Sequence, residues 1–376
     1  MTVVASHYTH WSRAAEVDGA RAVTRRNKTR CTIIWAAVLL IAAELAVRGR
    51  AWYRHGSASP VAGIYQADPI LGRTLRPGTT LTGSGRQFSI NRWGFRGPDF
   101  TREKPLNTLR IAVIGDSSSL GLEASSDDAV WVQCVVALLN SRGTRRFEAV
   151  NGALPGYTLG VSTLQLSNRI AAFDPDVVVA YQVTADIAAH SGRQFAGARK
   201  ADRVRSRLSR FLQKHSLLLN LIRVNMTGFR AKQATDLRYG RLDDDGLADY
   251  GRKLRGLVRL SADNGWRLVL CTCPRAFGDE AAPSDQHTLA ASALANNPSL
   301  SLAGLNDAYD RYNDLIRAVA RETGTPLVDV DEAVPRRADF FVDAVHLNDA
   351  GHRMVAEAVA AELMKLRELC GGNDGI

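Results

Sequence analysis

The chain contains 376 residues, of which 45% are hydrophobic, and this is enough for one large α/β domain with appended segments. Its formal net charge of +10 suits an anionic partner, but the sequence has no zinc-finger, RNA-recognition or helix-turn-helix pattern, so we expect no nucleic-acid partner. The five cysteines are scattered and no Cys/His cluster has metal-ligand spacing, which argues against a disulfide framework and predicts neither a metal nor a cofactor.

The N-terminal part of the chain has the pattern of a membrane anchor. Residues 1–30 are polar and basic, as in a cytoplasmic tail, and residues 31–47 form an apolar run interrupted by Thr32 and Glu44. The run is close to the ~20 residues that a bilayer requires. Basic residues are more numerous before the run than after it, which predicts a single-pass anchor in the inner (cell) membrane with the remaining chain on the extracytoplasmic side. A buried core helix and a cleaved signal peptide are the alternatives.

The next segments predict a small lead-in followed by one large domain. Residues 48–108 are rich in Gly, Pro, Ser and Thr and favour a linker and a small β-rich lead-in. From residue 109 to about residue 370, apolar β-branched runs alternate with helical periodicity. Strands are expected over residues 109–114, 147–150, 177–183, 267–272 and 327–330. Helices are expected over residues 129–139, 161–172, 247–261, 306–321 and 350–366. This rhythm predicts an α/β fold with a doubly wound, five-stranded parallel sheet.

A long insert, residues 188–241, separates the third and fourth predicted strands. Its first part is strongly basic, and its apolar residues Val204, Leu208, Phe211 and Leu212 recur at helical spacing. An amphipathic helix packed on the domain with a solvated basic face explains this pattern. A helix that lies against anionic headgroups or an anionic polymer is the second interpretation.

Two motifs carry the residues of a nucleophilic site. The sequence GDSSSLG follows the first predicted strand directly and places Ser117 at the carboxyl end of that strand. Near the other end of the chain, Asp343 precedes His346 by three residues, just before the last predicted helix. A histidine can take the serine proton if a carboxylate holds its second ring nitrogen. Because ligand sites of parallel sheets lie at the carboxyl ends of the strands, we expect Ser117, Asp343 and His346 to form a catalytic triad. His352 is expected to be structural.

These motifs resemble the conserved blocks of the SGNH/GDSL hydrolase superfamily, from about residue 110 to residue 368. GDSSSLG is similar to the first block, NGALPGYT at residues 151–158 to the second, and DAVHLN at residues 343–348 to the last. The resemblance implies a flavodoxin-like SGNH fold, Ser117 as the nucleophile, and the N–H groups of Ser117 and Gly152 as oxyanion donors. The lead-in also looks like that of membrane-anchored bacterial members, which are often found with polysaccharide acylation or export systems.

One block departs from the family pattern. The family has Gly-x-Asn-Asp after the third strand, with the Asn side chain as a further oxyanion donor, whereas this chain has Val183-Thr184-Ala185-Asp186. The hydroxyl of Thr184 is the candidate substitute for this donor. The loss of one oxyanion donor lowers turnover by ~10²–10³.

The sequence therefore favours a serine esterase or O-acyltransferase that acts on acyl esters, O-acetyl esters first, of a carbohydrate or glycolipid. Water as the acceptor makes it an esterase and a sugar hydroxyl makes it a transferase. The alternative is a weak or inactive binding or scaffold subunit of a polysaccharide assembly complex. A third hypothesis takes Asp329-Val330-Asp331 as an aspartyl phosphotransferase motif, although it lies on the last strand rather than the first.

Overall fold

A five-stranded parallel sheet forms the centre of the molecule. The computed structural model describes residues 31–32, 34–50, 52–53, 63–83, 86–142, 145–194, 216, 218–219, 239–278 and 284–370. The sheet has the order β6-β5-β7-β8-β9, and every neighbouring pair is parallel. Its strands are β5 (Thr108–Gly115), β6 (Arg146–Asn151), β7 (Val177–Tyr181), β8 (Arg267–Cys271) and β9 (Leu327–Val328). The predicted five-stranded parallel α/β sheet is confirmed.

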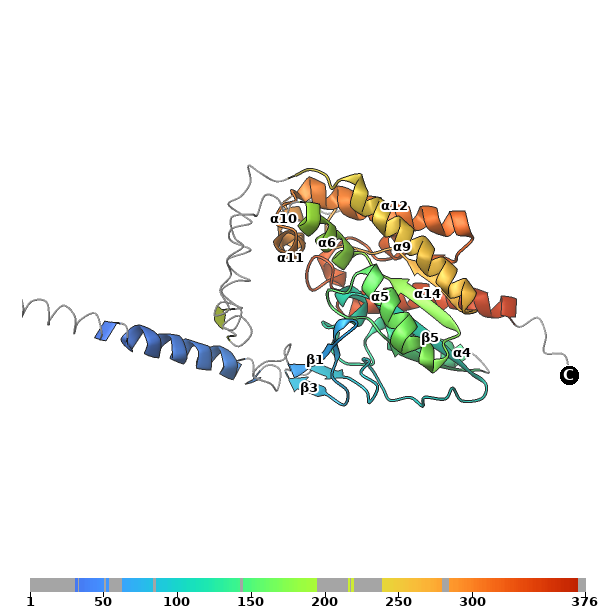
Figure 1. Cartoon of the computed structure of the whole chain (residues 1–376), viewed down its shortest axis with the longest axis horizontal. Helices are drawn as coiled ribbons and strands as arrows, with labels where there is room; N and C mark the ends of the chain where they lie inside the picture. The colour runs from blue at the N-terminus through green and yellow to red at the C-terminus, as the bar shows by residue number, and fades with distance from the viewer. Residues whose placement is uncertain are drawn as a thin grey trace, which may run out of the picture.

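Helices cover both faces of this sheet (Figure 1). On one face α4 (Trp131–Arg142) packs against α14 (Asp349–Cys370), and on the other α9 (Asp244–Asp263) packs against α5 (Leu159–Gln165) and α12 (Leu302–Thr323). The shorter helices are α3 (Ser117–Leu120), α6 (Thr184–Gln194), α10 (Gln286–Leu289), α11 (Ala291–Asn296) and α13 (Val330–Ala333). The chain leaves β5 toward β6 and later returns to its other side as β7, so β5 lies at the topological switch point where such sheets place their ligand site.

The helix predicted over residues 161–172 is interrupted in the structure. α5 ends at Gln165, a π-helical turn spans Leu166–Ile170, and a 3₁₀ turn, Ala171–Phe173, completes the connection to β7. A single periodicity of apolar residues cannot distinguish these turns from a continuous α-helix, because all of them bury the same side of the chain.

The lead-in forms two antiparallel hairpins that pack onto the domain. The hairpins pair β1 (Tyr65–Asp68) with β2 (Gly72–Leu75) and β3 (Thr80–Gly83) with β4 (Arg86–Ser89). Their apolar side chains form a second core with Leu120 of α3 and with the loop after β6; its buried members are Ile64, Leu71, Leu75, Phe88, Ile90, Leu120, Ala153, Leu154 and Tyr157. The lead-in therefore lies against the carboxyl edge of the sheet.

The predicted membrane anchor over residues 31–47 is not supported. Residues 34–50 are helical, but no helix in the described part of the chain is long and apolar enough to cross a membrane. The charge of Glu44 shortens the apolar run, and its carboxylate binds Arg48 on the same helix at 2.8 Å. The predicted cytoplasmic tail, residues 1–30, and most of the basic insert, residues 195–215, lie outside the described residues.

A buried ion pair joins the two strands at one side of the sheet. Arg110 on β5 is 0% exposed, and its guanidinium binds Glu148 on β6 at 2.5 Å. The same guanidinium also donates to the carbonyl oxygens of Thr101 and Arg102, which precede β5. A cation in this position requires its carboxylate, because a buried charge without a partner is strongly destabilising.

We predict that Glu148→Ala lowers the free energy of unfolding by about 3–5 kcal/mol, because it leaves the buried Arg110 cation unpaired. Urea unfolding followed by circular dichroism measures the loss. Glu322→Ala is the matched control, because Glu322 pairs with Arg255 on the surface and its loss should be clearly smaller. Equal losses in the two variants would contradict a stabilising role for the buried pair.

Candidate active site

The turn after β5 presents Ser117. Asp116 has extended backbone and caps α3, accepting a hydrogen bond from Ser118 N at 3.0 Å, and Ser117 is the first residue of the helix. Gly115 has no space for a side chain, because a Cβ there would lie 2.3 Å from Tyr181 O. Gly121 ends the helix with φ 77°, a conformation that favours glycine. The two glycines of GDSSSLG thus allow one short turn to display the serine.

Asp343 and His346 form a pair in the loop before α14. His346 Nδ1 lies 3.0 Å and 2.9 Å from the two carboxylate oxygens of Asp343. Asp343 Oδ1 also accepts the backbone N–H groups of Val345 and His346. This geometry fixes the ring and leaves Nε2 as the nitrogen available for proton transfer.

Electrostatics within the pair stabilise the charges that proton transfer requires. Burial alone would raise the pKa of Asp343, but the hydrogen bonds and charge of His346 outweigh it and lower that pKa to about 2. Burial alone would lower the pKa of His346, but Asp343 outweighs it, with smaller contributions from Asp116 and Glu123, so the pKa of the imidazole is raised. Asp343 therefore remains ionised while His346 accepts a proton.

Contacts across the carboxyl edge bring the serine turn and the histidine loop together. The charge of Asp116 acts on His346. Ser125, just after the serine turn, donates its N–H and its hydroxyl to the two carboxylate oxygens of Asp349, the first residue of α14. No hydrogen bond among the described residues joins Ser117 Oγ to His346, and such contacts commonly tighten only when substrate is bound.

The structure does not leave Gly152 free to act as an oxyanion donor. Its N–H donates to Val113 O at 2.9 Å and lies 3.1 Å from Val150 O, so it belongs to the edge of the sheet. The N–H of Ser117 lies in the first turn of α3, where N–H groups have no intrahelical partner.

Gly156 is the better candidate for the second donor. It has φ 77° and follows Pro155, and Tyr157 N donates to Leu154 O at 3.1 Å, the pattern of a type II turn. Leu154 N in turn donates to Gly115 O at 3.0 Å, which places this turn beside the serine turn. Within the described residues, Gly156 N–H donates to no hydrogen-bond acceptor. The Pro-Gly pair was the available sequence signal for this turn.

The third block has no amide side chain at residue 185, and the backbone N–H of this residue binds Asp116. Ala185 N donates to Asp116 Oδ2 at 3.0 Å, so this position holds the capping carboxylate. The Thr184 hydroxyl accepts from Tyr309 OH at 3.2 Å and lies 3.7 Å from Cys273 Sγ, both buried side chains. The hydroxyl of the half-buried Thr184 therefore contacts buried side chains, which does not fit the expected role of an oxyanion donor.

A buried polar network that sequence reasoning missed holds the Gly156 turn. Asp186 Oδ2 accepts from Leu159 N at 2.9 Å and from Gln182 Nε2 at 3.0 Å, and Gln182 Nε2 also donates to Tyr157 O at 2.7 Å. Burial raises the pKa of Asp186 to about 7 despite these hydrogen bonds. Asp186, the last residue of the third block, thus holds the second block through Leu159 and Gln182.

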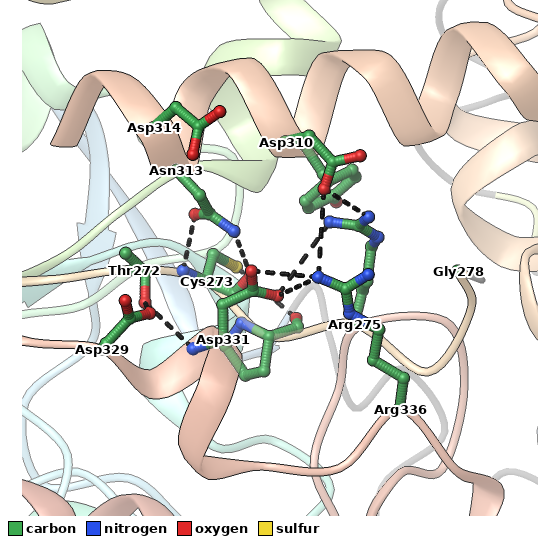
Figure 2. A network of polar contacts seen from close by, with 12 residues as sticks. Thr272, Cys273, Arg275, Gly278, Asp310, Asn313, Asp314, Asp329, Asp331 and Arg336 are labelled. Carbon is green, nitrogen blue, oxygen red and sulfur yellow. Dashed lines mark hydrogen bonds and ion pairs between the residues drawn. The ribbon is translucent and has the colours of Figure 1, made fainter. Parts of the chain in front are cut away.

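Ion pairs cluster around Arg275, Asp310, Asp331 and Arg336 (Figure 2), and a backbone hydrogen bond joins this cluster to the loop that carries Asp343. Arg275, after β8, is 1% exposed and donates to Asp310 on α12 at 2.6 Å, while Arg336 binds Asp331 at 3.1 Å. Ala276 N, the next residue after Arg275, donates to Ala344 O at 2.9 Å. The cluster therefore connects β8 and α12 to the residue that follows Asp343.

The same cluster leaves no role for the phosphotransferase hypothesis. Arg317 binds Asp329 at 2.7 Å and Asp331 at 3.2 Å, so arginines neutralise both carboxylates of that motif.

His352 is 0% exposed, and burial lowers its pKa to about 3. It is therefore neutral and packs beside Gly121, as expected of a structural histidine.

Comparison with known proteins gives one family match. The model of the GDSL-like Lipase/Acylhydrolase family matches residues 113–354. Among solved structures, LAE5, an alpha/beta hydrolase enzyme from the metagenome of Lake Arreo, Spain, is 20% identical with a TM-score of 0.42, and the match covers 69% of this chain and 96% of that one. Axe2, an acetylxylan esterase from Geobacillus stearothermophilus, is 19% identical with a TM-score of 0.42, covering 68% of this chain and 94% of that one. No curated protein matches the chain.

We predict that Asp343→Asn lowers the pKa of His346, because the carboxylate that stabilises the imidazolium is removed while burial still opposes the charge. NMR titration of the imidazole measures the shift. Asp339→Asn is the matched control, because Asp339 lies in the same loop but pairs with the exposed Arg337. An unchanged His346 midpoint in Asp343→Asn would show that the pair is not coupled in solution.

Proposed function

The chain belongs to the GDSL-like lipase/acylhydrolase family and is an ester-bond hydrolase, and from this premise we propose that Ser117 is the nucleophile that carries the acyl group. The observation that supports this most strongly is the hydrogen-bonded Asp343–His346 pair, at the same edge of the sheet as the Ser117 turn. An imidazole held by a carboxylate is the base that a serine nucleophile needs.

The proposed reaction has two acyl transfers. His346 Nε2 takes the proton of Ser117 Oγ as this oxygen bonds to the acyl carbonyl carbon. The negative oxygen of the tetrahedral intermediate accepts hydrogen bonds from the N–H groups of Ser117 and Gly156. His346 then returns the proton to the leaving alcohol as the ester C–O bond breaks. An acceptor hydroxyl attacks the acyl-enzyme by the reverse sequence and restores Ser117.

We further propose a short acyl ester, O-acetyl first, on a carbohydrate or glycolipid as the substrate. The resemblance of the lead-in to members associated with polysaccharide acylation supports this choice. The net charge of +10 is compatible with an anionic polymer or surface. Water as the acceptor gives an esterase, and a sugar hydroxyl gives an O-acyltransferase.

A catalytically weak hydrolase that serves chiefly as a binding or scaffold subunit is the second candidate, because Ala185 stands where the family pattern has the Asn donor. The remaining donors are both backbone N–H groups. If these are insufficient to stabilise the oxyanion, the domain retains its fold and its triad without useful turnover.

We predict that the full-length protein hydrolyses p-nitrophenyl acetate, and that Ser117→Ala abolishes turnover and labelling by a fluorophosphonate. Ser118→Ala is the matched control, since Ser118 is the neighbouring serine but is buried, and it should retain labelling. Mass analysis of the labelled peptide identifies the modified residue. Equal signals from the wild-type protein and Ser117→Ala would favour the scaffold role.

We also predict that Ala185→Asn raises kcat by about 10-fold or more, because it restores the side-chain donor whose loss costs ~10²–10³. Steady-state kinetics on the same ester measures the gain. Ala185→Leu fills similar space without a donor and should give no gain. If the Asn and Leu variants behaved alike, another group would already supply the third donor.

A further inference from the structure

Arg73 of the lead-in contacts the turn that carries the candidate oxyanion donor. It lies on β2, and its Nη2 donates to Pro155 O at 2.5 Å. The guanidinium carbon stacks 4.7 Å above the ring centre of Tyr65. The Arg73 side chain is exposed, and no carboxylate of the described residues forms an ion pair with it. A cation thus lies at this turn with a peptide carbonyl as its partner.

The carbonyl that Arg73 binds belongs to the same peptide group as Gly156 N–H. The described chain has no cis peptide bond. Pro155 O and Gly156 N–H therefore lie in the plane of one peptide group and point in opposite directions. A hydrogen bond that fixes the oxygen therefore fixes the direction of the N–H. Arg73 Nη2 also lies 3.2 Å from the position that a Gly156 Cβ would take, so the guanidinium covers that side of the glycine.

We propose that Arg73 is a positioning residue for the oxyanion hole, acting through the Pro155–Gly156 peptide; this rests on the proposed esterase function. The charge-assisted hydrogen bond to Pro155 O polarises the peptide and strengthens its N–H as a donor. It also holds the N–H in place before substrate binds, so that no reorientation is needed as the oxyanion forms. Because Ala185 stands in place of the amide donor, stabilisation of the oxyanion depends more strongly on each remaining N–H group.

A second contact makes the connection between hairpin and turn rigid. Tyr157 OH donates to the backbone oxygen of Arg73 at 2.5 Å, so the hairpin and the turn bind each other in both directions. Burial raises the pKa of Tyr157 to about 12, which keeps this hydroxyl protonated as a donor. Leu75, 2% exposed, anchors β2 in the second core, so Arg73 extends from a fixed strand.

The test compares Arg73→Ala, Arg73→Gln and Arg73→Lys in the full-length protein on p-nitrophenyl acetate, a neutral ester that offers the guanidinium no anionic group. Arg76→Ala is the matched control. Arg76 follows the same strand, and its guanidinium donates to Tyr65 O at 3.4 Å rather than to the Gly156 turn.

We expect Arg73→Ala and Arg73→Gln to lower kcat about 10-fold with little change in KM, a smaller loss than removal of an oxyanion donor itself. Arg73→Lys should recover part of the rate, and Arg76→Ala should match the wild type. The melting temperatures of the Arg73 and Arg76 variants should agree. The affinity for a boronic acid, which mimics the tetrahedral intermediate, should fall in the same variants and by a similar factor.

Two different results would overturn the proposal. If the wild-type protein turns over ester through Ser117 but Arg73→Ala behaves like Arg76→Ala, or changes KM alone, Arg73 does not act on the oxyanion donor and the esterase function stands. If the wild-type protein shows no Ser117-dependent turnover, the proposed function fails, and the role of Arg73 fails with it.

Discussion

The buried carboxylate of Asp116 is the constraint on which the rest of the site depends. It is 1% exposed and accepts N–H groups from its own turn, at Ser118, and from the first turn of α6 after β7, at Ala185. Burial raises the pKa of Asp116, although these hydrogen bonds and His346 oppose that shift. One side chain therefore positions the proposed nucleophile, ties two neighbouring strands at their carboxyl ends and favours the charged form of the His346 imidazole.

The strands and the Asp343–His346 pair could be predicted from the sequence, because each depends on residues that are close together in the chain. Continuous apolar runs such as 177–183 predicted buried parallel strands, and the DxxH spacing predicted the Asp343–His346 pair within a few residues of chain. The chemistry of a serine, a histidine and a carboxylate at one sheet edge followed from the order of strands and loops.

The oxyanion donors were harder to predict, because their identity depends on which N–H groups the fold has already used. Gly152 and Gly156 both follow β6, and the sequence pattern predicted Gly152 as the donor. Only the three-dimensional structure shows that the N–H of Gly152 already donates to Val113 O, whereas a turn leaves the N–H of Gly156 available. The contact from Arg73 is separated by 82 positions from its partner, Pro155, and no local pattern records it.

The position of the lead-in also changes where the functional unit begins. The family match starts at residue 113, but the turn at Pro155–Gly156, the proposed oxyanion donor, packs against hairpins that start at Tyr65. A fragment that begins at β5 retains Ser117, Asp343 and His346 but lacks these hairpins. Under the proposed mechanism, the catalytic rate therefore also depends on a surface appendage that lies apart from the three proposed reacting side chains.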